Sequence, residues 1–454
     1  DAGDPDTLLK YADTAMYRAK QAGRDTVRFF TAEMNNEMLR RHDLEMALHR
    51  AVANGEFVLH YQPKVDLDSG RVAGLEALLR WQRPGHGLVS PADFIPLLEE
   101  TGLIVDVGRW VITTVCQQIN RWLQSPVGPL QVAVNVSGRQ FVDGDLEADV
   151  IGALDANGVP AALLELELTE SSLMANTERT VATLEKLKAI GVQISIDDFG
   201  TGYSSLAYLR RFPIDKLKID ITFIRDITSD PDDAAIARTI IRMAHSLRLE
   251  VIAEGVETAA QVAYLRRHHC DEAQGFYFSR PLSVSGLEVL LAEGGCLGAA
   301  DRSGGASPKT LLLVDDDADA LDLLHGLLQQ DGYRILTATS GAEGLEMLAL
   351  NEVQVVVSDQ RMPAMSGSQF LDRVKDLHPD TLRIILSGYA DFESIIDAIN
   401  CGAIYRFYKK PWAGNVIRND IRDAFRHQAR MHDHPPEDVT TAAGLAPPTP
   451  AAKP

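Results

Sequence analysis

Cysteine, long apolar runs and positive charge are all scarce in this chain. Its four cysteines form no CxxC pair: Cys116, Cys270, Cys296 and Cys401. That spacing indicates reduced cytosolic thiols rather than a disulfide framework or a zinc site. No apolar run approaches the roughly 18 residues of a membrane span, and no basic segment followed by an apolar one forms a leader. We therefore expect a cytosolic protein without a membrane span.

The balance of charge argues against one class of partner. The chain has 44 Lys and Arg residues against 64 Asp and Glu residues, a net charge of −20. Such acidity repels phosphate backbones and anionic lipid, so we expect neither DNA nor a membrane face as the main partner. A phosphorylated small ligand is compatible with this charge where bound cations reverse it locally.

Composition divides the chain into two globular units. At roughly 150 residues per domain, the length of 454 residues predicts about three domains. Residues 292–308 contain five glycines, typical of a flexible linker, and residues 433–454 contain six prolines, typical of a disordered tail. The expected units are a large one at 55–291 and a small one at 309–432. The first residue is Asp1 rather than Met, so we expect a piece of a longer polypeptide.

The large unit alternates short strand-like runs with helical stretches such as 180–190 and 234–247. The eight expected strands are 57–65, 72–81, 130–136, 163–169, 192–197, 215–220, 249–254 and 274–279. Eight strands alternating with helices in about 250 residues predict a (β/α)₈ TIM-like barrel. A doubly wound open sheet is the competing architecture.

Polar side chains stand at the C-terminal ends of the predicted strands. They are Glu76, Asn135, Glu167, Asp197, Asp198, Lys218, Glu254 and Gln274. In a barrel these ends converge on the face where such enzymes carry out chemistry. Separate solvated carboxylates are the alternative, but polar groups at the ends of seven of the eight predicted strands argue against it.

The chemistry of these converging carboxylates points to divalent cations. Neighbouring carboxylates cannot all ionise without cations, because like charges raise one another's pKa. An all-oxygen set suits Mg²⁺ or Mn²⁺, whereas zinc prefers His or Cys. Two such ions about 4 Å apart stabilise the attacking and leaving oxygens in phosphodiester hydrolysis. We expect Asp197 to bridge the two ions, Lys218 to orient or deprotonate the attacking water, and Arg80 to hold a phosphate oxygen.

These residues lie in motifs with a recognisable order. The motifs are EALLRW from Glu76, NVS from Asn135, ELTES from Glu167, DDFGTGYSSL from Asp197, LKID, AEGVE and QGFYFSRPL. From about residue 40 to residue 290 the chain resembles the EAL-domain family of cyclic di-guanylate (c-di-GMP) phosphodiesterases. The resemblance implies hydrolysis of one phosphodiester bond to give linear pGpG, with two Mg²⁺ or Mn²⁺ ions.

The resemblance also implies roles for individual residues. The implied metal ligands are Glu76, Asn135, Glu167, Asp197, Asp198 and Glu254. The implied catalytic residues are Glu76, Glu254, Lys218, Gln274 and Glu170, and the implied ligand-side residues are Gln62, Arg80 and Arg280. Glu170 is expected to brace the loop 199–206, which also shapes a homodimer contact in the family. Because no catalytic position departs from the pattern, we expect an active hydrolase; a catalytically silent c-di-GMP sensor that signals through a partner protein is the alternative.

Two further motifs favour a structural interpretation. Residues 200–205 mimic the GxGxxG dinucleotide fingerprint, but Ser205 replaces the third glycine and two carboxylates precede the loop, which argues against a nicotinamide site. His268, His269 and Cys270 are adjacent. Adjacent residues in a helix project in different directions, which argues against a zinc site.

The small unit alternates five strands with amphipathic helices. The expected strands are 310–315, 334–339, 353–359, 382–388 and 404–408. They predict a doubly wound, five-stranded parallel sheet with its site at the strand C-termini. Asp315, Asp316 and Asp359 end neighbouring strands and make one Mg²⁺ site. Ser387 and Lys410 can hold a phosphoryl group placed on one of these carboxylates.

Over roughly residues 309–430 this pattern resembles the receiver domain of two-component response regulators. The resemblance implies that Asp359 accepts a phosphoryl group from a cognate histidine kinase or phosphotransfer protein. It further implies that Asp315 and Asp316 bind Mg²⁺ and that Phe407 is the switching aromatic residue. We expect phosphorylation to regulate the barrel in a bacterial cytoplasm. An inert docking module is the alternative, and a DNA-binding regulator is disfavoured because only a proline-rich tail follows.

The first residues carry a third resemblance. Residues 5–30 resemble the last helix and strand of a GGDEF diguanylate cyclase domain, although the glycine-rich signature is absent. We expect residues 1–31 to be a remnant too short to bury its own core. An amphipathic connecting helix is expected over 32–54.

Overall fold

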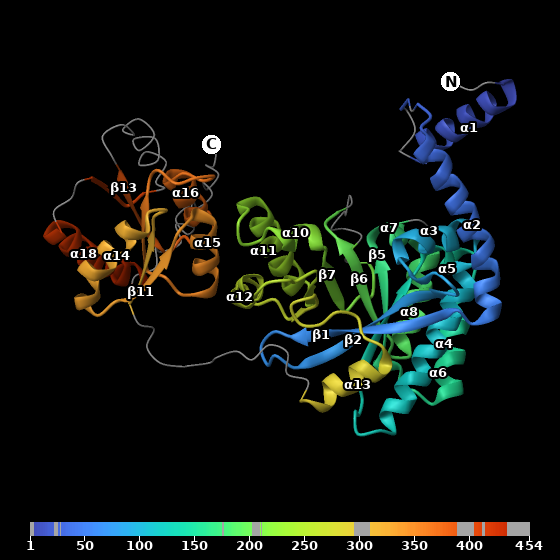
Figure 1. The fold of residues 1–454 in the computed structure, drawn as a ribbon. Coiled ribbons are helices and arrows are strands. Elements are labelled where there is room, and N and C mark those ends of the chain that lie inside the picture. The colour runs from blue at the N-terminus through green and yellow to red at the C-terminus, as the bar shows by residue number, and fades with distance from the viewer. Residues whose placement is uncertain are drawn as a thin grey trace, which may run out of the picture. The chain divides into compact units, whose positions relative to one another are not determined.

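The computed structural model describes most of the chain as two bodies built around separate β-sheets (Figure 1). The described residues are 4–21, 26–27, 29–174, 177–201, 209, 211–294, 309–387, 404–410 and 414–433. The expected proline-rich tail lies outside them, apart from its first residue, and so does most of the expected linker.

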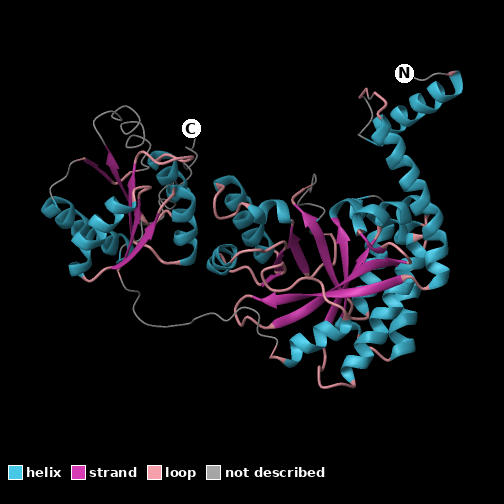
Figure 2. Cartoon of the chain, viewed as in Figure 1, coloured by secondary structure: helices cyan, strands magenta, loops and turns pink. Residues whose placement is uncertain are grey.

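The first body is a closed eight-stranded barrel with helices on the outside of the strands (Figure 2). Its strands are β1 Phe57–Asp66, β2 Val72–Arg83, β4 Gln131–Val136, β5 Leu164–Thr169, β6 Gln193–Phe199, β7 Lys216–Ile219, β8 Glu250–Ala253 and β9 Glu272–Ala273. They follow the order β1-β9-β8-β7-β6-β5-β4-β2, and pairing of β1 with β2 closes the ring. This closure confirms the barrel and excludes the open sheet. The short strand β3 Gly87–Val89 extends β2 as a hairpin.

The first strand of the barrel runs against its neighbours. β1 pairs antiparallel with both β2 and β9, whereas the remaining ring pairs are parallel. A tight turn at 67–71, not a helix, joins β1 to β2, so the expected strict alternation of strand and helix is wrong at this point. The eighth predicted strand is also displaced. The structure has strand at Glu272–Ala273, and residues 274–279 form turns.

Helices cover the parallel part of the barrel. They are α3 Pro91–Thr101, α4 Ile104–Leu123, α5 Gly138–Val142, α6 Leu146–Asn157, α7 Glu170–Met174, α8 Thr177–Ala189, α10 Ile221–Arg225, α11 Pro231–Ser246, α12 Ala259–Arg267 and α13 Val284–Ala292, with a 3₁₀ turn at Ala161–Leu163. The longest of them, α4, is amphipathic and buries one apolar face, including Val111, Val115 and Trp122. The strand residues alternate between this helical layer and the barrel interior.

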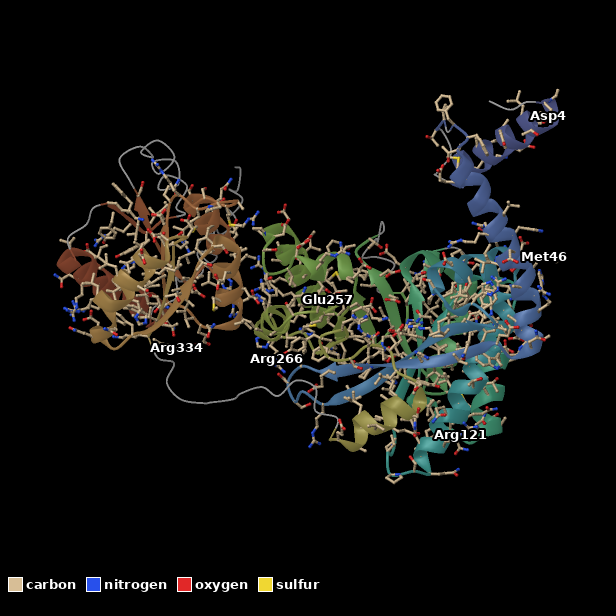
Figure 3. All side chains as sticks on the ribbon, in the orientation of Figure 1. Asp4, Met46, Arg121, Glu257, Arg266 and Arg334 are labelled. Carbon is tan, nitrogen blue, oxygen red and sulfur yellow. The ribbon has the colours of Figure 1, made fainter. Side chains whose placement is uncertain are left out.

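Two helices precede the barrel. α1 spans Pro5–Gln21 and α2 spans Ala32–Asn54, which begins at the Thr31 cap and ends at Gly55 with φ of 66°. Leu44 and Leu48 are buried on α2, whereas Met46 is 54% exposed (Figure 3). The amphipathic pattern of this segment therefore places an apolar face toward the body.

The second body has a five-stranded parallel sheet in the order β11-β10-β12-β13-β14. The strands are β10 Thr310–Val314, β11 Arg334–Ala338, β12 Val355–Asp359, β13 Leu382–Ser387 and β14 Arg406–Lys409. The described helices are α14 Ala318–Leu328, α15 Gly341–Leu350, α16 Gly367–Leu377 and α18 Gly414–Asp433, with a 3₁₀ turn at Gln329–Asp331. This arrangement confirms the doubly wound sheet predicted for the small unit.

Candidate functional site

The C-terminal ends of the barrel strands bring most of the predicted polar residues together. Lys218 on β7 is fully buried at the centre of the group. Its Nζ lies 2.9 Å from Glu167 Oε2, 3.2 Å from Asp197 Oδ1 and 3.9 Å from Glu76 Oε2, and it also pairs with Glu254. Four carboxylates from four different strands or strand ends therefore share one ammonium group.

Side-chain amides hold Glu76 in place. Asn135 Nδ2 donates to Glu76 Oε1 at 2.6 Å, and Gln274 Nε2 donates to Glu76 Oε2 at 2.5 Å. Gln274 also donates to Gln62 Oε1 at 3.1 Å. Gln62 is the direct antiparallel partner of Glu76 between β1 and β2, which explains why these residues meet. Glu76 lies inside the long strand β2 rather than at its end, because β2 continues beyond the barrel into the hairpin with β3.

A second group of oxygens lies beside this network. Asp197, Asp198 and Glu254 each offer a carboxylate oxygen, and these atoms lie within 4.8 Å of one another. Asp198 has φ of 56°, a left-handed backbone that a non-glycine residue rarely adopts. Its own N–H donates to Asp197 Oδ1 at 2.9 Å. Strain of this kind concentrates at functional sites.

Two glycines permit the close packing that follows Glu254 and Gln274. Gly255 has φ of 67°, and a Cβ placed there would lie 2.2 Å from Ile221 Cγ1. A Cβ on Gly275 would lie 2.0 Å from the carbonyl oxygen of Val256. Both positions therefore require glycine, which fixes the direction in which the two strand ends leave the barrel.

Burial and neighbouring charges shift the pKa values of the site in opposite directions. Burial raises the pKa of Glu76 to about 7, that of Glu254 to about 8 and that of Asp198 to about 6. Burial also acts to raise the pKa of Glu167, but Lys218 and Lys64 outweigh it and hold that pKa at about 2. Burial disfavours the charged form of Lys218, yet the carboxylates around it, with Glu167 first, raise its pKa well above the usual range.

Two cavities open beside the cluster. One of about 280 Å³ is lined by Gln62, Glu76, Asp197, Glu254 and Gln274 together with Glu257, which Figure 3 labels. A second, of about 470 Å³, has a more apolar wall and includes Arg80, Asn135 and Thr169. Glu76 and Asn135 are hydrogen-bonded to each other, so the two cavities flank the same pair of residues.

Three other predicted residues lie at the edge of this arrangement or apart from it. Arg80 Nη1 donates to the Leu79 carbonyl at 2.9 Å. Arg280 is exposed and stacks over the Phe276 ring at 4.3 Å. Glu170 is buried at the start of α7, and its Oε2 has no hydrogen-bond partner among the described residues. Residues 202–206 of the loop 199–206 that it is expected to brace lie outside the described part of the chain.

Lys64 and Glu165 are buried charges beneath the cluster that the pattern of polar strand ends does not predict. Lys64 on β1 donates to Glu165 Oε1 at 2.8 Å and to Glu167 Oε1 at 2.7 Å. The alternation in LELEL and KLKI was the available signal. Both faces of a barrel strand are buried, so charges at every second residue must face the interior and find partners there.

The second body has a smaller acidic site at its strand ends. Asp315, Asp316 and Asp359 each place a carboxylate oxygen within 4.8 Å of the others. Lys410 Nζ lies 3.2 Å from Asp315 Oδ2 and also pairs with Asp359. Burial raises the pKa of Asp315, although the Asp317 N–H and Lys410 oppose that shift.

The remaining predicted residues of this body lie on the neighbouring strands. Ser387 ends β13 and is buried, and its carbonyl accepts a hydrogen bond from the Lys410 N–H at 2.7 Å. Phe407 on β14 is 37% exposed. The three aspartates and Lys410 therefore form one group, while Phe407 lies on β14, the edge strand of the sheet.

A closed barrel with a carboxylate cluster around one buried lysine, followed by a parallel sheet with three strand-end aspartates, defines a two-module chain. Residues 45–281 match the EAL domain and residues 311–422 match the response regulator receiver domain. The chain belongs to the EAL domain family. Domains of this family are metal-dependent, and the described residues contain the two acidic groups above.

The similar proteins come from several bacteria. The chain is 45% identical over 289 residues to the bifunctional diguanylate cyclase/c-di-GMP phosphodiesterase MucR of Pseudomonas aeruginosa, covering 63% of this chain and 42% of that protein. It is 42% identical over 285 residues to the c-di-GMP phosphodiesterase PdeR of Escherichia coli, covering 63% and 43%. The chain thus spans about two fifths of the length of these relatives.

A solved structure extends the comparison. The complex of the PaMucR phosphodiesterase with c-di-GMP matches with 46% identity and a TM-score of 0.52, over 54% of this chain and 99% of that one. Separately, none of the helices in the described residues is long and apolar enough to cross a membrane.

Proposed function

We propose that this chain hydrolyses c-di-GMP to linear pGpG at the mouth of the barrel, the end formed by the C-terminal ends of its parallel strands. The observation that carries the proposal is the cavity lined by Glu76, Asp197, Glu254 and Gln274, whose three carboxylates also surround the buried Lys218. Membership of the EAL family supports it, as do PdeR and MucR, whose names describe c-di-GMP phosphodiesterases.

The donor set fits divalent cations. Every candidate ligand offers oxygen, and the carboxylates outnumber the one ammonium group among them, a charge balance that hard cations would complete. The residues that would hold two Mg²⁺ or Mn²⁺ ions are Glu76, Asn135, Glu167, Asp197, Asp198 and Glu254. Bound there, such ions would supply charge stabilisation for the attacking and leaving oxygens of the phosphodiester.

The protein's own side chains position the reactants. Lys218 is held as an ammonium by its carboxylate neighbours, so we assign it to orient the attacking water by donating to it rather than to remove a proton. Gln274 donates hydrogen bonds from its single amide nitrogen to both Glu76 and Gln62 and so fixes the positions of these two side chains. Arg80 lines the larger cavity, and its guanidinium is assigned to hold a phosphate oxygen of the substrate. Arg280 and Gln62 complete the proposed ligand side.

The second body is proposed to regulate this reaction through phosphorylation of Asp359. Asp315 and Asp316 would hold one Mg²⁺ beside it, and Ser387 and Lys410 would contact the phosphoryl group. The receiver match supports a phosphodonor partner such as a histidine kinase.

Release of pGpG from c-di-GMP in the presence of Mg²⁺ tests the proposal. Wild type is expected to turn over, and Glu76→Ala is expected to lose turnover because it removes a ligand and both amide contacts. Glu185→Ala, which makes the same change at an exposed carboxylate on α8, is the matched control. Binding of c-di-GMP by wild type without pGpG release would instead support a silent sensor.

A further inference from the structure

A column of alternating charges runs through the barrel interior beneath the proposed site. Its members, from the base toward the mouth, are Glu272, Lys216, Glu165, Lys64, Glu167 and Lys218. Successive pairs have N to O distances of 2.8, 3.8, 2.8, 2.7 and 2.9 Å. None of the six side chains is more than 10% exposed. Barrel interiors are ordinarily filled by branched apolar residues, so this column needs an explanation.

Fold stability alone does not explain it. Removing paired charges from water carries a desolvation penalty, and well-packed apolar residues often replace buried ion pairs without loss of stability. Lys64 comes from β1, the strand that runs against the others, and inserts between two carboxylates of a single strand, Glu165 and Glu167. These residues are two apart on β5 and face the same side, so without Lys64 their charges would oppose each other.

The two oxygens of Glu167 are divided between two lysines. Oε1 accepts from Lys64 at 2.7 Å, and Oε2 accepts from Lys218 at 2.9 Å. Lys218 belongs to the cluster at the mouth, whereas Lys64 has no contact with that cluster except through Glu167 among the interactions described. The carboxylate is therefore oriented with Oε1 toward the interior and Oε2 toward the mouth.

We propose that Lys64 is a positioning residue that holds Glu167 Oε1, so that Oε2 is the oxygen that would face a bound divalent cation. The inference deepens the proposed function, because it rests on Glu167 acting as a ligand. Outer partners of this kind orient a ligand and keep its remaining lone pairs satisfied. Lys216, which contacts Glu165 and Glu272 one level lower, has no such contact with Glu167 and provides the matched comparison.

Binding of Mn²⁺ to the full chain, measured from the electron paramagnetic resonance signal of the free ion, tests the role of Lys64. All variants carry Asp315→Asn and Asp359→Asn so that the signal reports the barrel. Lys64→Met is expected to weaken Mn²⁺ binding about 10-fold to 100-fold, the usual effect of losing an outer partner. Lys216→Met removes another buried cation of the same column and is expected to bind Mn²⁺ as the parent, the protein carrying only Asp315→Asn and Asp359→Asn, does.

The same variants assayed for c-di-GMP hydrolysis separate positioning from folding. A positioning role predicts that Lys64→Met needs more Mn²⁺ for half-maximal turnover and recovers kcat at saturating Mn²⁺. Unchanged Mn²⁺ affinity in Lys64→Met, or equal weakening in Lys216→Met, would overturn the proposal. If Lys64→Met does not fold, the double variant Lys64→Met/Glu165→Gln also removes the negative charge of Glu165 that Lys64 would otherwise pair. The Mn²⁺ affinity of this double variant is then compared with that of the parent, with the same expected result. Wild-type protein, with Asp315 and Asp359 intact, that binds Mn²⁺ but releases no pGpG with or without acetyl phosphate would refute the proposed function while leaving the test of Lys64 intact.

Discussion

The two acidic sites of this chain each contain one lysine, but they hold it differently. Lys218 in the barrel is fully buried and contacts four carboxylates. The side chain of Lys410 in the second body is 32% exposed and forms ion pairs with Asp315 and Asp359 among the described residues. The barrel lysine is enclosed by its surroundings, whereas the lysine of the second body is partly exposed to solvent.

The difference matches what each site is proposed to do. Repeated hydrolysis of one substrate benefits from preorganised charges that do not rearrange during the reaction. A phosphorylation switch instead needs groups that can exchange partners when a phosphoryl group arrives on Asp359. Loss of a charge should therefore have a large constitutive effect in the barrel and a conditional effect in the receiver.

The largest expected effect is that of metal removal. Chelation by EDTA is expected to abolish pGpG release, because the carboxylates around Lys218 would then lack the cations that balance them. Addition of Mg²⁺ or Mn²⁺ in excess of the chelator should restore turnover. Steady pGpG release by protein shown to be metal-free by elemental analysis would contradict the proposed mechanism.

Substitution of the buried lysine should have the next largest effect. Lys218→Met is expected to lower kcat by about 10²-fold to 10⁴-fold, the range for loss of a group that assists proton transfer or orients the nucleophile. Lys186→Met, on the exposed surface of α8, is the control. A kcat for Lys218→Met within the error of wild type would show that the enclosed lysine has no part in the reaction.

Substitution of Asp359, the proposed phosphoacceptor, should affect only the response to phosphorylation. Acetyl phosphate is expected to label wild type at Asp359, as detected by intact-protein mass spectrometry, and to change its rate of pGpG release. Asp359→Asn should take up no label and show no response. If the unlabelled variant still responds to acetyl phosphate, or if labelled wild type does not respond, the second body does not regulate through Asp359.

The smallest expected effect concerns stability at acidic pH. Burial lowers the pKa of His268 from 6.5 to about 4, and the cations that add to this shift are Arg238, Arg267, Arg242 and His269. Between pH 6.5 and pH 4 the unfolded chain binds a proton that the folded chain does not, so stability falls as the pH falls through this window. Because His268 is partly exposed, we expect a loss on the order of 1 kcal/mol.

Urea unfolding followed by tryptophan fluorescence measures this pH effect, because Trp81 and Trp122 are buried in the barrel. His268→Gln should remove this one contribution, so its unfolding free energy relative to that of wild type should rise as the pH falls from 6.5 to 4. His269→Gln, at an exposed position, should show no such change relative to wild type. Parallel curves for wild type and His268→Gln would contradict the prediction.

The sequence was sufficient for the two architectures and for the residues at the mouth. Regular alternation of strand and helix predicted the barrel, and the polar ends of its strands predicted the residues that meet around Lys218. The residues at the edge were harder to place. Arg80 and Arg280 have long side chains whose direction depends on their surroundings, and Arg280 instead stacks on Phe276.

Two features could not be predicted from local pattern. The direction of β1 depends on a tight turn and on pairing with β9, more than 200 residues away in the chain. Lys64 faces the interior because of that direction: the register of β1 against β2 and β9 sets which of its side chains point inward. Both are tertiary properties, which a reading of strand periodicity along the chain does not contain.

The reversed first strand also decides where the chain enters the barrel. α2 ends at Asn54, and β1 starts at Phe57 opposite Trp81, near the mouth end of β2. A displacement of α2 along its axis would thus be transmitted first to the mouth of the barrel and then along β1, the strand that carries Gln62 and Lys64. In an all-parallel barrel the same helix would connect to the opposite end of the barrel, a full strand length from the proposed site.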